Sequence, residues 1–253
     1  MKMVISPAKS LQFDTQLPTS VQTEPLFGVE AQKINDLLKK KSPKELSKLM
    51  SISDKLAELN WERNQAFQMS ESKAASRAAI FTFNRDVYQG LDAYSLDENK
   101  IEQMQGQLRI LSGLYGFLKP LDAIQPYRLE MGTALKVGSH KNLYSFWKDK
   151  ITNQLNAEMD SDELFINLAS NEYFSVIDAK SLVAKIVTPQ FKDFKNGKLK
   201  IISFFAKKAR GMMARHLIEN NASKMEDIIS FTSQGYSYSE EETTDVLSPV
   251  FIR

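Results

Sequence analysis

The sequence of 253 residues contains no cysteine. Thiol peroxidase chemistry, cysteine-ligated iron–sulfur clusters and cysteine-based zinc sites are therefore excluded. Disulfides are excluded too, which is consistent with a reducing compartment. Histidine is nearly as scarce, because only His140 and His216 are present and neither has a glutamate three residues before it. The Glu-x-x-His ligands of a carboxylate di-iron centre are thus missing, and we expect neither a metal nor a redox cofactor.

Long apolar runs are also missing. No stretch approaches the roughly 18 residues of a membrane span, and the apolar run near the start is too short for a signal peptide. The sequence has no Gly-rich dinucleotide loop, no Walker-type phosphate loop and no serine-centred hydrolase elbow. We therefore expect a cytoplasmic protein with no membrane partner and no nucleotide cofactor.

An excess of charge of either sign is absent as well. Lysine and arginine total 33 against 31 aspartates and glutamates, a formal net charge of +2. A protein of this charge can bind a polyanion only if its basic residues gather on one surface. The 15 phenylalanines and 8 tyrosines predict a core rich in aromatic packing. Since there is no repeat and no long linker, a single domain over residues 1–253 is the simplest organisation.

Helical and extended patterns alternate along the chain. Helices are predicted at residues 24–41, from 43, from about 53 to beyond 61, at 144–159 and at 206–220. Strands are predicted at residues 3–6, 108–111, 164–168, 184–188 and 200–204. Residues 76–91 are ambiguous, with 79–81 as the best strand nucleus. The alternation indicates a mixed α/β (α+β) fold whose strand order cannot be read from the sequence.

Residues 43–67 are predicted to form a helical hairpin. Leu46, Leu49, Ile52 and Ala57 fall on the apolar positions of a helix-hairpin-helix element. The turn of that motif exposes backbone amides at the start of its second helix, where they can hold a DNA phosphate. Such contacts position a protein on DNA without reading its sequence.

The turn of this hairpin departs from the usual motif. Ser51 and Ser53 stand where glycines are usual, and Asp54 brings a negative charge that Lys55 only partly offsets. We retain Ser51, Ser53 and Lys55 as candidate DNA contacts. The alternative is a purely structural helix pair, in which Ser53 is an N-cap and Asp54 suits the helix dipole.

The strongest compositional bias lies at residues 195–215, which hold seven lysines and arginines and no acidic residue. Lys207, Lys208 and Arg210 fall in the first turns of a predicted helix, where cations oppose the helix dipole unless an anion is bound. We therefore interpret these three residues, together with Arg215, as candidate phosphate ligands. The alternative is a solvated cationic face paired with the acidic segment that follows.

Three further candidates lie at the ends of predicted elements. Lys9 follows the first strand, and Arg128 lies in a loop bounded by proline and glycine, where it either lines a site or pairs with Glu130. Glu172 is the carboxylate that we would test first as a general base. Its alternative role is that of an ion-pair partner for a cleft arginine.

Six segments together resemble the YaaA-like peroxide-stress resistance family, and they follow the family order over most of the chain. They are ISPAK at 5–9, ISDKLA at 52–57, LSGLYG at 111–116, QPYRLEMG at 125–132, NLASNEYF at 167–174 and KIISFFAKKARG at 200–211. The resemblance implies a compact mixed α/β fold with a helix-hairpin-helix element and a positively charged cleft. It also implies DNA binding and a cytosolic role that limits oxidative damage by hydrogen peroxide, linked to unincorporated iron.

The main functional prediction is thus a non-sequence-specific DNA-binding protein that is not an enzyme. Its expected partner is double-stranded or structured DNA, and a monomer is compatible with the sequence. Two alternatives stay open. One is a nucleic-acid-processing enzyme, similar to a glycosylase, that uses the same basic cleft. The other is a protein-interaction module that acts on iron homeostasis without DNA.

Overall fold

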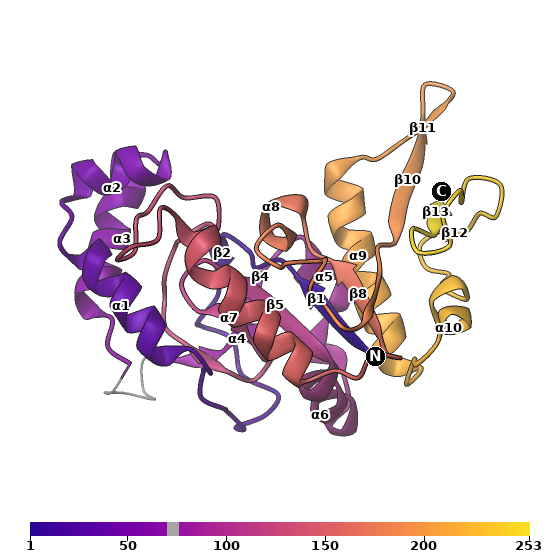
Figure 1. Cartoon of the computed structure of the whole chain (residues 1–253), viewed down its shortest axis with the longest axis horizontal. Coiled ribbons are helices and arrows are strands. Elements are labelled where there is room, and N and C mark those ends of the chain that lie inside the picture. The colour runs from indigo at the N-terminus through magenta and orange to yellow at the C-terminus, as the bar shows by residue number, and fades with distance from the viewer. Residues whose placement is uncertain (70–75) are drawn as a thin grey trace.

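A five-stranded sheet forms the centre of the computed structural model, which describes residues 1–69 and 76–253 (Figure 1). Its strand order is β6-β5-β1-β8-β9. β1 (Lys2–Ile5) is parallel to both of its neighbours, β5 (Leu108–Ser112) and β8 (Leu164–Leu168). β9 (Lys185–Val187) is parallel to β8, and β6 (Gly116–Leu118) is antiparallel to β5. The expected mixed α/β architecture is confirmed.

The central strands form where the sequence has short continuous apolar runs. Met3, Val4 and Ile5 of β1 have no exposed surface, and all five residues of β5 are buried. Parallel strands that are covered on both faces have this pattern, in contrast to the alternation of a half-exposed strand. The predicted strands at 3–6, 108–111, 164–168 and 184–188 are confirmed to within a residue or two.

The order of these strands creates a switch point in the sheet. From β1 the chain passes to β5 on one side, and it then crosses to β8 on the other side of β1. The connections above the sheet therefore diverge between β1 and β8. In open parallel sheets such a point leaves a crevice beyond the carboxyl ends of the strands, and ligands bind there.

Ten α-helices surround the sheets in the described part of the chain. They are α1 (Gly28–Lys39), α2 (Pro43–Met50), α3 (Asp54–Ala66), α4 (Ala79–Thr82), α5 (Val87–Leu91), α6 (Glu98–Gln107), α7 (Leu143–Ala157), α8 (Asn171–Phe174), α9 (Ser203–Glu219) and α10 (Met225–Ile229). None of the described helices is long and apolar enough to span a membrane.

A second sheet lies toward the C-terminus, with the order β11-β10-β13-β12. It contains β10 (Gln190–Lys195), β11 (Lys198–Lys200), β12 (Ser237–Tyr238) and β13 (Val250–Ile252). β10 and β11 form a hairpin that projects from the body of the molecule (Figure 1). Its turn is Asn196-Gly197, and both residues have positive φ, as a two-residue hairpin turn requires.

Two small two-stranded sheets complete the topology. β2 (Ser10–Leu11) pairs with β4 (Phe83–Asn84), and β3 (Arg77–Ala78) pairs with β7 (Ala123–Ile124). Both pairings are antiparallel. The first pairing joins the segment that follows β1 to the segment that precedes α5, and thereby brings the two close together.

The predicted helical hairpin is present as α2 and α3. Ser42 begins α2 with a reciprocal capping box, in which its side chain bonds the amide of Glu45 and Glu45 bonds back. Pro43 occupies the first helical position, where its missing amide costs nothing. Ser51 ends the helix in the left-handed conformation, with φ of 51°. The start and end of α2 are thus explained by its own capping residues.

Helices α5 and α9 cross at unusually close range. A β-carbon at Gly211 of α9 would collide with the carbonyl oxygen of Val87, and one at Gly90 of α5 would collide with that of Lys208. Backbone therefore meets backbone at this crossing, and only glycine permits it. The contact fixes the position of the cationic part of α9.

Two strand predictions are wrong. Residues 79–81 form part of α4 and are completely surrounded, and the amides of Ala79 and Ile80 donate to the carbonyls of Asp122 and Pro120. A short apolar run that is buried on all sides has no period that separates strand from helix.

Residues 200–204 are also not a strand, because pairing with β10 ends at Lys200 and α9 already begins at Ser203. The first predicted helix likewise begins later than expected, at Gly28.

Candidate functional site

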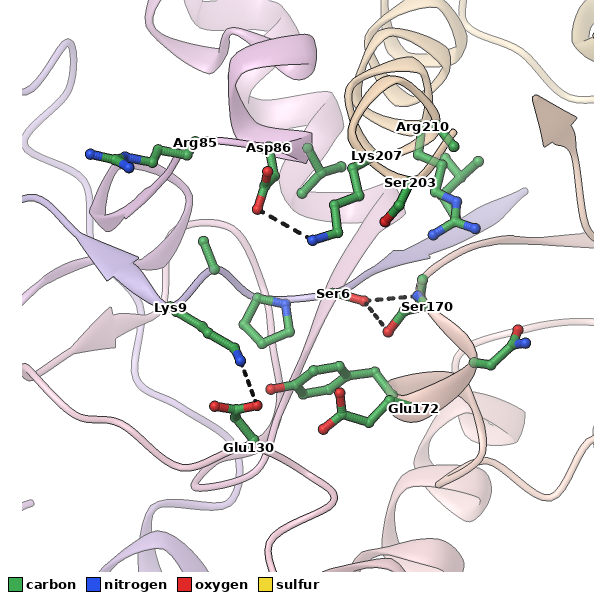
Figure 2. A pocket seen from close by; sticks show the side chains of 18 of the residues that line it. Ser6, Lys9, Arg85, Asp86, Glu130, Ser170, Glu172, Ser203, Lys207 and Arg210 are labelled. Atoms are coloured by element: carbon green, nitrogen blue, oxygen red, sulfur yellow. Dashed lines mark hydrogen bonds and ion pairs between the residues drawn. The ribbon is translucent and has the colours of Figure 1, made fainter. Parts of the chain in front are cut away.

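A cavity of about 750 Å³ opens at the switch point, beyond the carboxyl ends of β1 and β8 (Figure 2). We call it the switch-point pocket. The pocket is lined in part by the segments that directly follow β1, β8 and β9. Loops at the carboxyl ends of these strands therefore form the wall of the crevice that the strand order predicts. The lining segments are 6–10, 84–87, 127–130, 168–173, 188, 190, 201, 203, 206–207 and 210.

The loops after β1 and β8 are tied together at the base of this pocket. The hydroxyl of Ser6 donates to the hydroxyl of Ser170 at 3.2 Å, and the amide of Ser170 donates to the Ser6 oxygen at 2.9 Å (Figure 2). The hydroxyl of Tyr88 also donates to the carbonyl of Ser6 at 3.1 Å. These bonds hold the two halves of the sheet edge in a fixed geometry.

Helix α9 supplies a cationic wall. Lys207 and Arg210, three residues apart, lie on the same helix face and line the pocket (Figure 2). Lys207 forms a long ion pair of 3.7 Å with Asp86. Arg210 makes no ion pair or hydrogen bond with residues 1–69 or 76–253, and burial lowers its pKa. A partly buried guanidinium without a partner is costly, and an anion in the pocket would offset that cost.

The opposite wall is an ion-pair cluster around Glu130. Lys9 lies 2.8 Å from one oxygen of this carboxylate, and Arg128 lies 3.0 Å from the other. The alternative in which Arg128 pairs with Glu130 is thus confirmed, although Arg128 and Lys9 also line the pocket. The Nε atom of Arg128 is buried and has no hydrogen-bond partner in the described chain. This wall therefore keeps one unused donor.

Glu172 enters the pocket from the start of α8. Its Oε1 accepts a hydrogen bond from the amide of Gly132 at 3.2 Å, and its carbonyl accepts one from the hydroxyl of Tyr144 at 2.9 Å. Burial, together with the nearby Glu172 charge, raises the pKa of Tyr144. The expected ion pair between Glu172 and a cleft arginine is wrong for the described residues, because the partner is a backbone amide.

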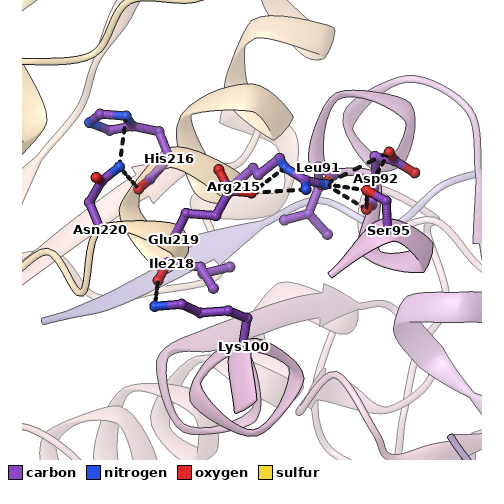
Figure 3. A network of polar contacts seen from close by, with 9 residues as sticks. All are labelled: Leu91, Asp92, Ser95, Lys100, Arg215, His216, Ile218, Glu219 and Asn220. Atoms are coloured by element: carbon purple, nitrogen blue, oxygen red, sulfur yellow. Dashed lines mark hydrogen bonds and ion pairs between the residues drawn. The ribbon is translucent and has the colours of Figure 1, made fainter. Parts of the chain in front are cut away.

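Arg215 does not reach the pocket. Its guanidinium donates to the carbonyls of Leu91 and Asp92 at 3.1 and 2.8 Å, and to the hydroxyl of Ser95 at 2.8 Å (Figure 3). It also pairs with Glu219 at 2.9 Å. These contacts fasten α9 to the end of α5, so the donors that we assigned to DNA are already occupied. Lys208 is half-buried and likewise lies outside the lining of the pocket.

The three hairpin candidates lie apart from the pocket. Ser51, Ser53 and Lys55 are exposed at the turn between α2 and α3, at the far end of the molecule from α9 (Figure 1). Ser53 is the N-cap residue of α3, but its side chain makes no capping hydrogen bond. The turn is instead fastened by Ser47, whose hydroxyl donates to the carbonyl of Ile52 at 2.7 Å. Phosphate binding by this turn remains a prediction.

Several pocket residues were not predicted. Arg85 and Asp86 line the pocket with φ values of 74° and 49°, a left-handed backbone that is uncommon for residues other than glycine. No sequence pattern announces such a conformation. Ser6, in contrast, ends a predicted strand, and Ser170 follows another by two residues. Both could have been selected as Lys9 was, by their position at the end of a strand.

The cations of α9 do not lie at its N-terminal dipole end, contrary to the expectation from the sequence. Because the helix begins at Ser203, Lys207 and Arg210 lie in its second turn and not at its dipole end. The requirement for an anion therefore rests on the unpartnered Arg210 side chain. As to metals, no group of three or more histidines, aspartates or glutamates in the described chain could hold an ion.

The segments that surround the pocket also carry the likeness to known proteins. A family model described as "Peroxide stress protein YaaA" matches residues 1–242. The chain belongs to the YaaA family. A UPF0246 protein of Flavobacterium johnsoniae is 58% identical over 238 residues, or 94% of each chain. A UPF0246 protein of Aliivibrio fischeri is 51% identical over 246 residues, covering 96% of this chain and 95% of the relative.

Membership of the YaaA family confirms the resemblance seen in the sequence. Four of the six segments that carried it contribute residues to the switch-point pocket, namely 5–9, 125–132, 167–174 and 200–211. A fifth, 111–116, packs against a residue of the pocket lining, because Gly113 lies directly against the carbonyl of Leu129. The sixth is the turn of the α2–α3 hairpin. The features that define the likeness to the YaaA family thus gather at two places.

Proposed function

We propose that the chain binds the sugar–phosphate backbone of DNA without sequence specificity, through the α9 wall of the switch-point pocket. The observation that carries the proposal is Arg210, a partly buried guanidinium without a partner among the described residues. A guanidinium presents two parallel donors that match the oxygens of a phosphate. The ion pair between Lys207 and Asp86 is long, at 3.7 Å, so the ammonium group of Lys207 can also contact the phosphate that Arg210 binds.

The charges of the pocket explain why the expected partner is a backbone phosphate. Five cationic and three acidic side chains are found among its described lining residues. Glu130 already neutralises two of the cations, Lys9 and Arg128. The surplus of positive charge therefore lies on the side of α9. Contacts of this kind fix position on DNA but do not distinguish bases, because every nucleotide carries the same phosphate.

The α2–α3 hairpin is the second contact in this proposal. Its exposed turn presents Ser51, Ser53 and Lys55 at the N-terminus of α3, as in a helix-hairpin-helix element. Burial and, secondarily, the charge of Arg128 lower the pKa of Arg63 on α3, so this arginine of the hairpin lies near a cation of the pocket. This binding is proposed to serve the peroxide stress response for which the family is described, in the cytoplasm and linked to free iron.

The test compares two variants of equal net charge. One carries Lys207→Gln and Arg210→Gln, and the control carries Lys136→Gln and Lys141→Gln, at exposed positions outside the pocket. Binding of a fluorescent duplex is measured by anisotropy over a series of KCl concentrations. Each lost phosphate contact should reduce the log–log salt slope by about 1. We expect a slope reduced by about 2 and affinity at least tenfold lower, with wild-type values for the control.

If both double variants bind alike, the α9 wall is not the phosphate site and the proposal is wrong. The enzyme alternative is tested in parallel, because Glu172 lines the same pocket. An enzyme that uses this carboxylate as a general base would convert damaged or modified DNA, and Glu172→Gln would abolish turnover while binding persists. A protein-interaction module would ignore DNA even at low salt and would retain a protein partner in pull-downs.

A further inference from the structure

The carboxylate of Asp86 lies against the cationic α9 wall of the switch-point pocket. Its Oδ2 atom is 3.7 Å from the Nζ atom of Lys207, and Asp86 is the only acidic residue of the described pocket lining that makes an ion pair with α9 (Figure 2). Both side chains are partly exposed, and ion pairs in such places add little to stability. A carboxylate at this position competes with any phosphate that Lys207 and Arg210 would bind. Its presence therefore bears on which phosphates the wall accepts.

The backbone holds Asp86 in this place against its local preference. Asp86 has φ of 49° and ψ of −117°, a combination that only glycine adopts readily, and Arg85 before it has φ of 74°. Such residues persist where the surrounding structure imposes them, and they cluster at ligand sites. Asp86 is also the N-cap residue of α5, but its side chain makes no capping hydrogen bond. The carboxylate is thus held toward Lys207 and not toward the helix that it precedes.

The charges that face the interior of the pocket leave a surplus of a single positive charge. On the α9 wall, Lys207 and Arg210 are cationic, and Asp86 neutralises one of them. The opposite wall is neutral, since it holds two cations and two carboxylates, namely Lys9, Arg128, Glu130 and Glu172. The guanidinium of Arg85, which also lines the pocket, points away from Lys207 and Arg210 (Figure 2). Without Asp86 the α9 wall would carry two uncompensated positive charges.

Phosphate groups differ in charge according to their esterification. A phosphodiester of the DNA backbone carries one negative charge, whereas a phosphomonoester carries about two above pH 7, because its second pKa is about 6. The attraction to a cationic wall grows in proportion to the ligand charge, but the cost of removing the ligand from water grows with the square of that charge. A wall with a surplus of one positive charge is therefore suited to the diester, and a wall with two such charges to the monoester.

We infer that Asp86 determines which phosphates the α9 wall binds: its carboxylate favours phosphodiesters and discriminates against phosphomonoesters and inorganic phosphate. This inference rests on the proposed function, since the same wall holds the DNA backbone. Repulsion of a wrong ligand by a like charge is a common source of specificity. With Asp86 in place, small dianionic phosphates in the cell would not displace the DNA backbone from Lys207 and Arg210.

The experiment compares two small probes of similar size on the full-length protein, at about pH 8 and constant ionic strength. Methyl phosphate is a dianion under these conditions, and dimethyl phosphate is a monoanion. Each probe is titrated against a fluorescent duplex in an anisotropy competition, and its binding is measured independently by the rise in melting temperature. We expect the wild type to bind dimethyl phosphate at least as tightly as methyl phosphate.

Asp86→Asn should raise the affinity for methyl phosphate relative to dimethyl phosphate by at least about fivefold, because a like charge next to a partly exposed site has been removed. Asparagine tolerates positive φ as well as aspartate does, so the backbone at residue 86 should be kept. In a second variant, Lys207→Gln is added to Asp86→Asn. The α9 wall then has a surplus of one positive charge again, so the affinity ratio should return to within about twofold of the wild-type value.

The matched control is Asp178→Asn, which changes the net charge of the protein by the same amount. Asp178 lies outside the pocket and pairs at 2.9 Å with Lys148, whose side chain is 48% exposed, as is that of Lys207. This variant should keep the wild-type ratio of the two affinities and the wild-type affinity for duplex DNA. An equal shift of the ratio in the control would reveal an effect of net charge alone and would overturn the inference.

The other outcomes separate this inference from the proposed function. A wild type that prefers methyl phosphate as strongly as Asp86→Asn does would overturn the inference and leave backbone binding intact. The same holds if the double variant keeps the ratio of Asp86→Asn, because the charge of the wall would then not set the preference. Absence of duplex binding by the wild type would refute the proposed function itself, and this inference with it.

Discussion

Replacing Gly211 by alanine tests whether the close crossing of α5 and α9 positions the cationic wall. The new β-carbon would lie far inside the contact distance of the Val87 carbonyl oxygen. Because β-carbons do not approach other heavy atoms within 3.0 Å, the helices must separate by at least about 1 Å. Overpacking typically costs about 1–3 kcal/mol, and the opposing group here is backbone that cannot turn aside, so we expect about 3 kcal/mol.

For a protein of this length, a loss of about 3 kcal/mol corresponds to a melting temperature lower by about 6–12 °C. The measurement is thermal unfolding followed by circular dichroism, together with duplex binding well below the transition. The control is Gly106→Ala on α6, where an added β-carbon meets nothing within 4 Å. That change should be neutral or stabilising by up to about 1 kcal/mol, because alanine favours helix over glycine. A Gly211→Ala protein as stable as the control would refute the reasoning.

Two further predictions concern ionic contacts away from the pocket. The guanidinium of Arg109 is 3% exposed and lies 2.7 Å from the carboxylate of Glu158. Glu158→Ala should leave this buried charge unpaired and lower the free energy of unfolding, measured in urea, by about 3–5 kcal/mol. A loss below about 1 kcal/mol would contradict this prediction. Asp227 accepts amide hydrogen bonds from Ser223 and Lys224 that lower its pKa below 3.8. A folded-state pKa below the unfolded value gives stability that is present above about pH 4 and is lost as the pH falls through the folded pKa. The difference in urea midpoint between wild type and Asp227→Asn should therefore shrink in acid, and a constant difference would exclude this linkage.

The central strands could be predicted from the sequence because their cause is local. Each is a short apolar run between polar residues, and β1 and β5 are buried on both faces as such runs suggest. Residues 79–82 have the same composition but form α4, since their amides find partners near residue 122 that no local pattern reveals. The strand order, and with it the switch point, depends on pairings between distant segments and could not be read from the sequence.

The candidate site was predictable where residues follow strands or share a helix face. Lys9, Arg128, Glu172, Lys207 and Arg210 were predicted and do line the pocket. Lys208 and Arg215 lie on a different stripe of the same helix, and a charge run alone does not tell which stripe faces a cavity. Arg85 and Asp86 were missed because their left-handed backbone is imposed by the surrounding fold.

The hydrogen bonds between Ser6 and Ser170 join positions 164 residues apart in the chain. The pocket consequently exists only when nearly the whole polypeptide has folded, and whatever occupies it must shift the unfolding equilibrium of the entire molecule. Ligand at about 100 times its dissociation constant adds roughly 2.7 kcal/mol to stability. A melting-curve screen of mononucleotides and short oligonucleotides can therefore find occupants of this pocket with no activity assay at all.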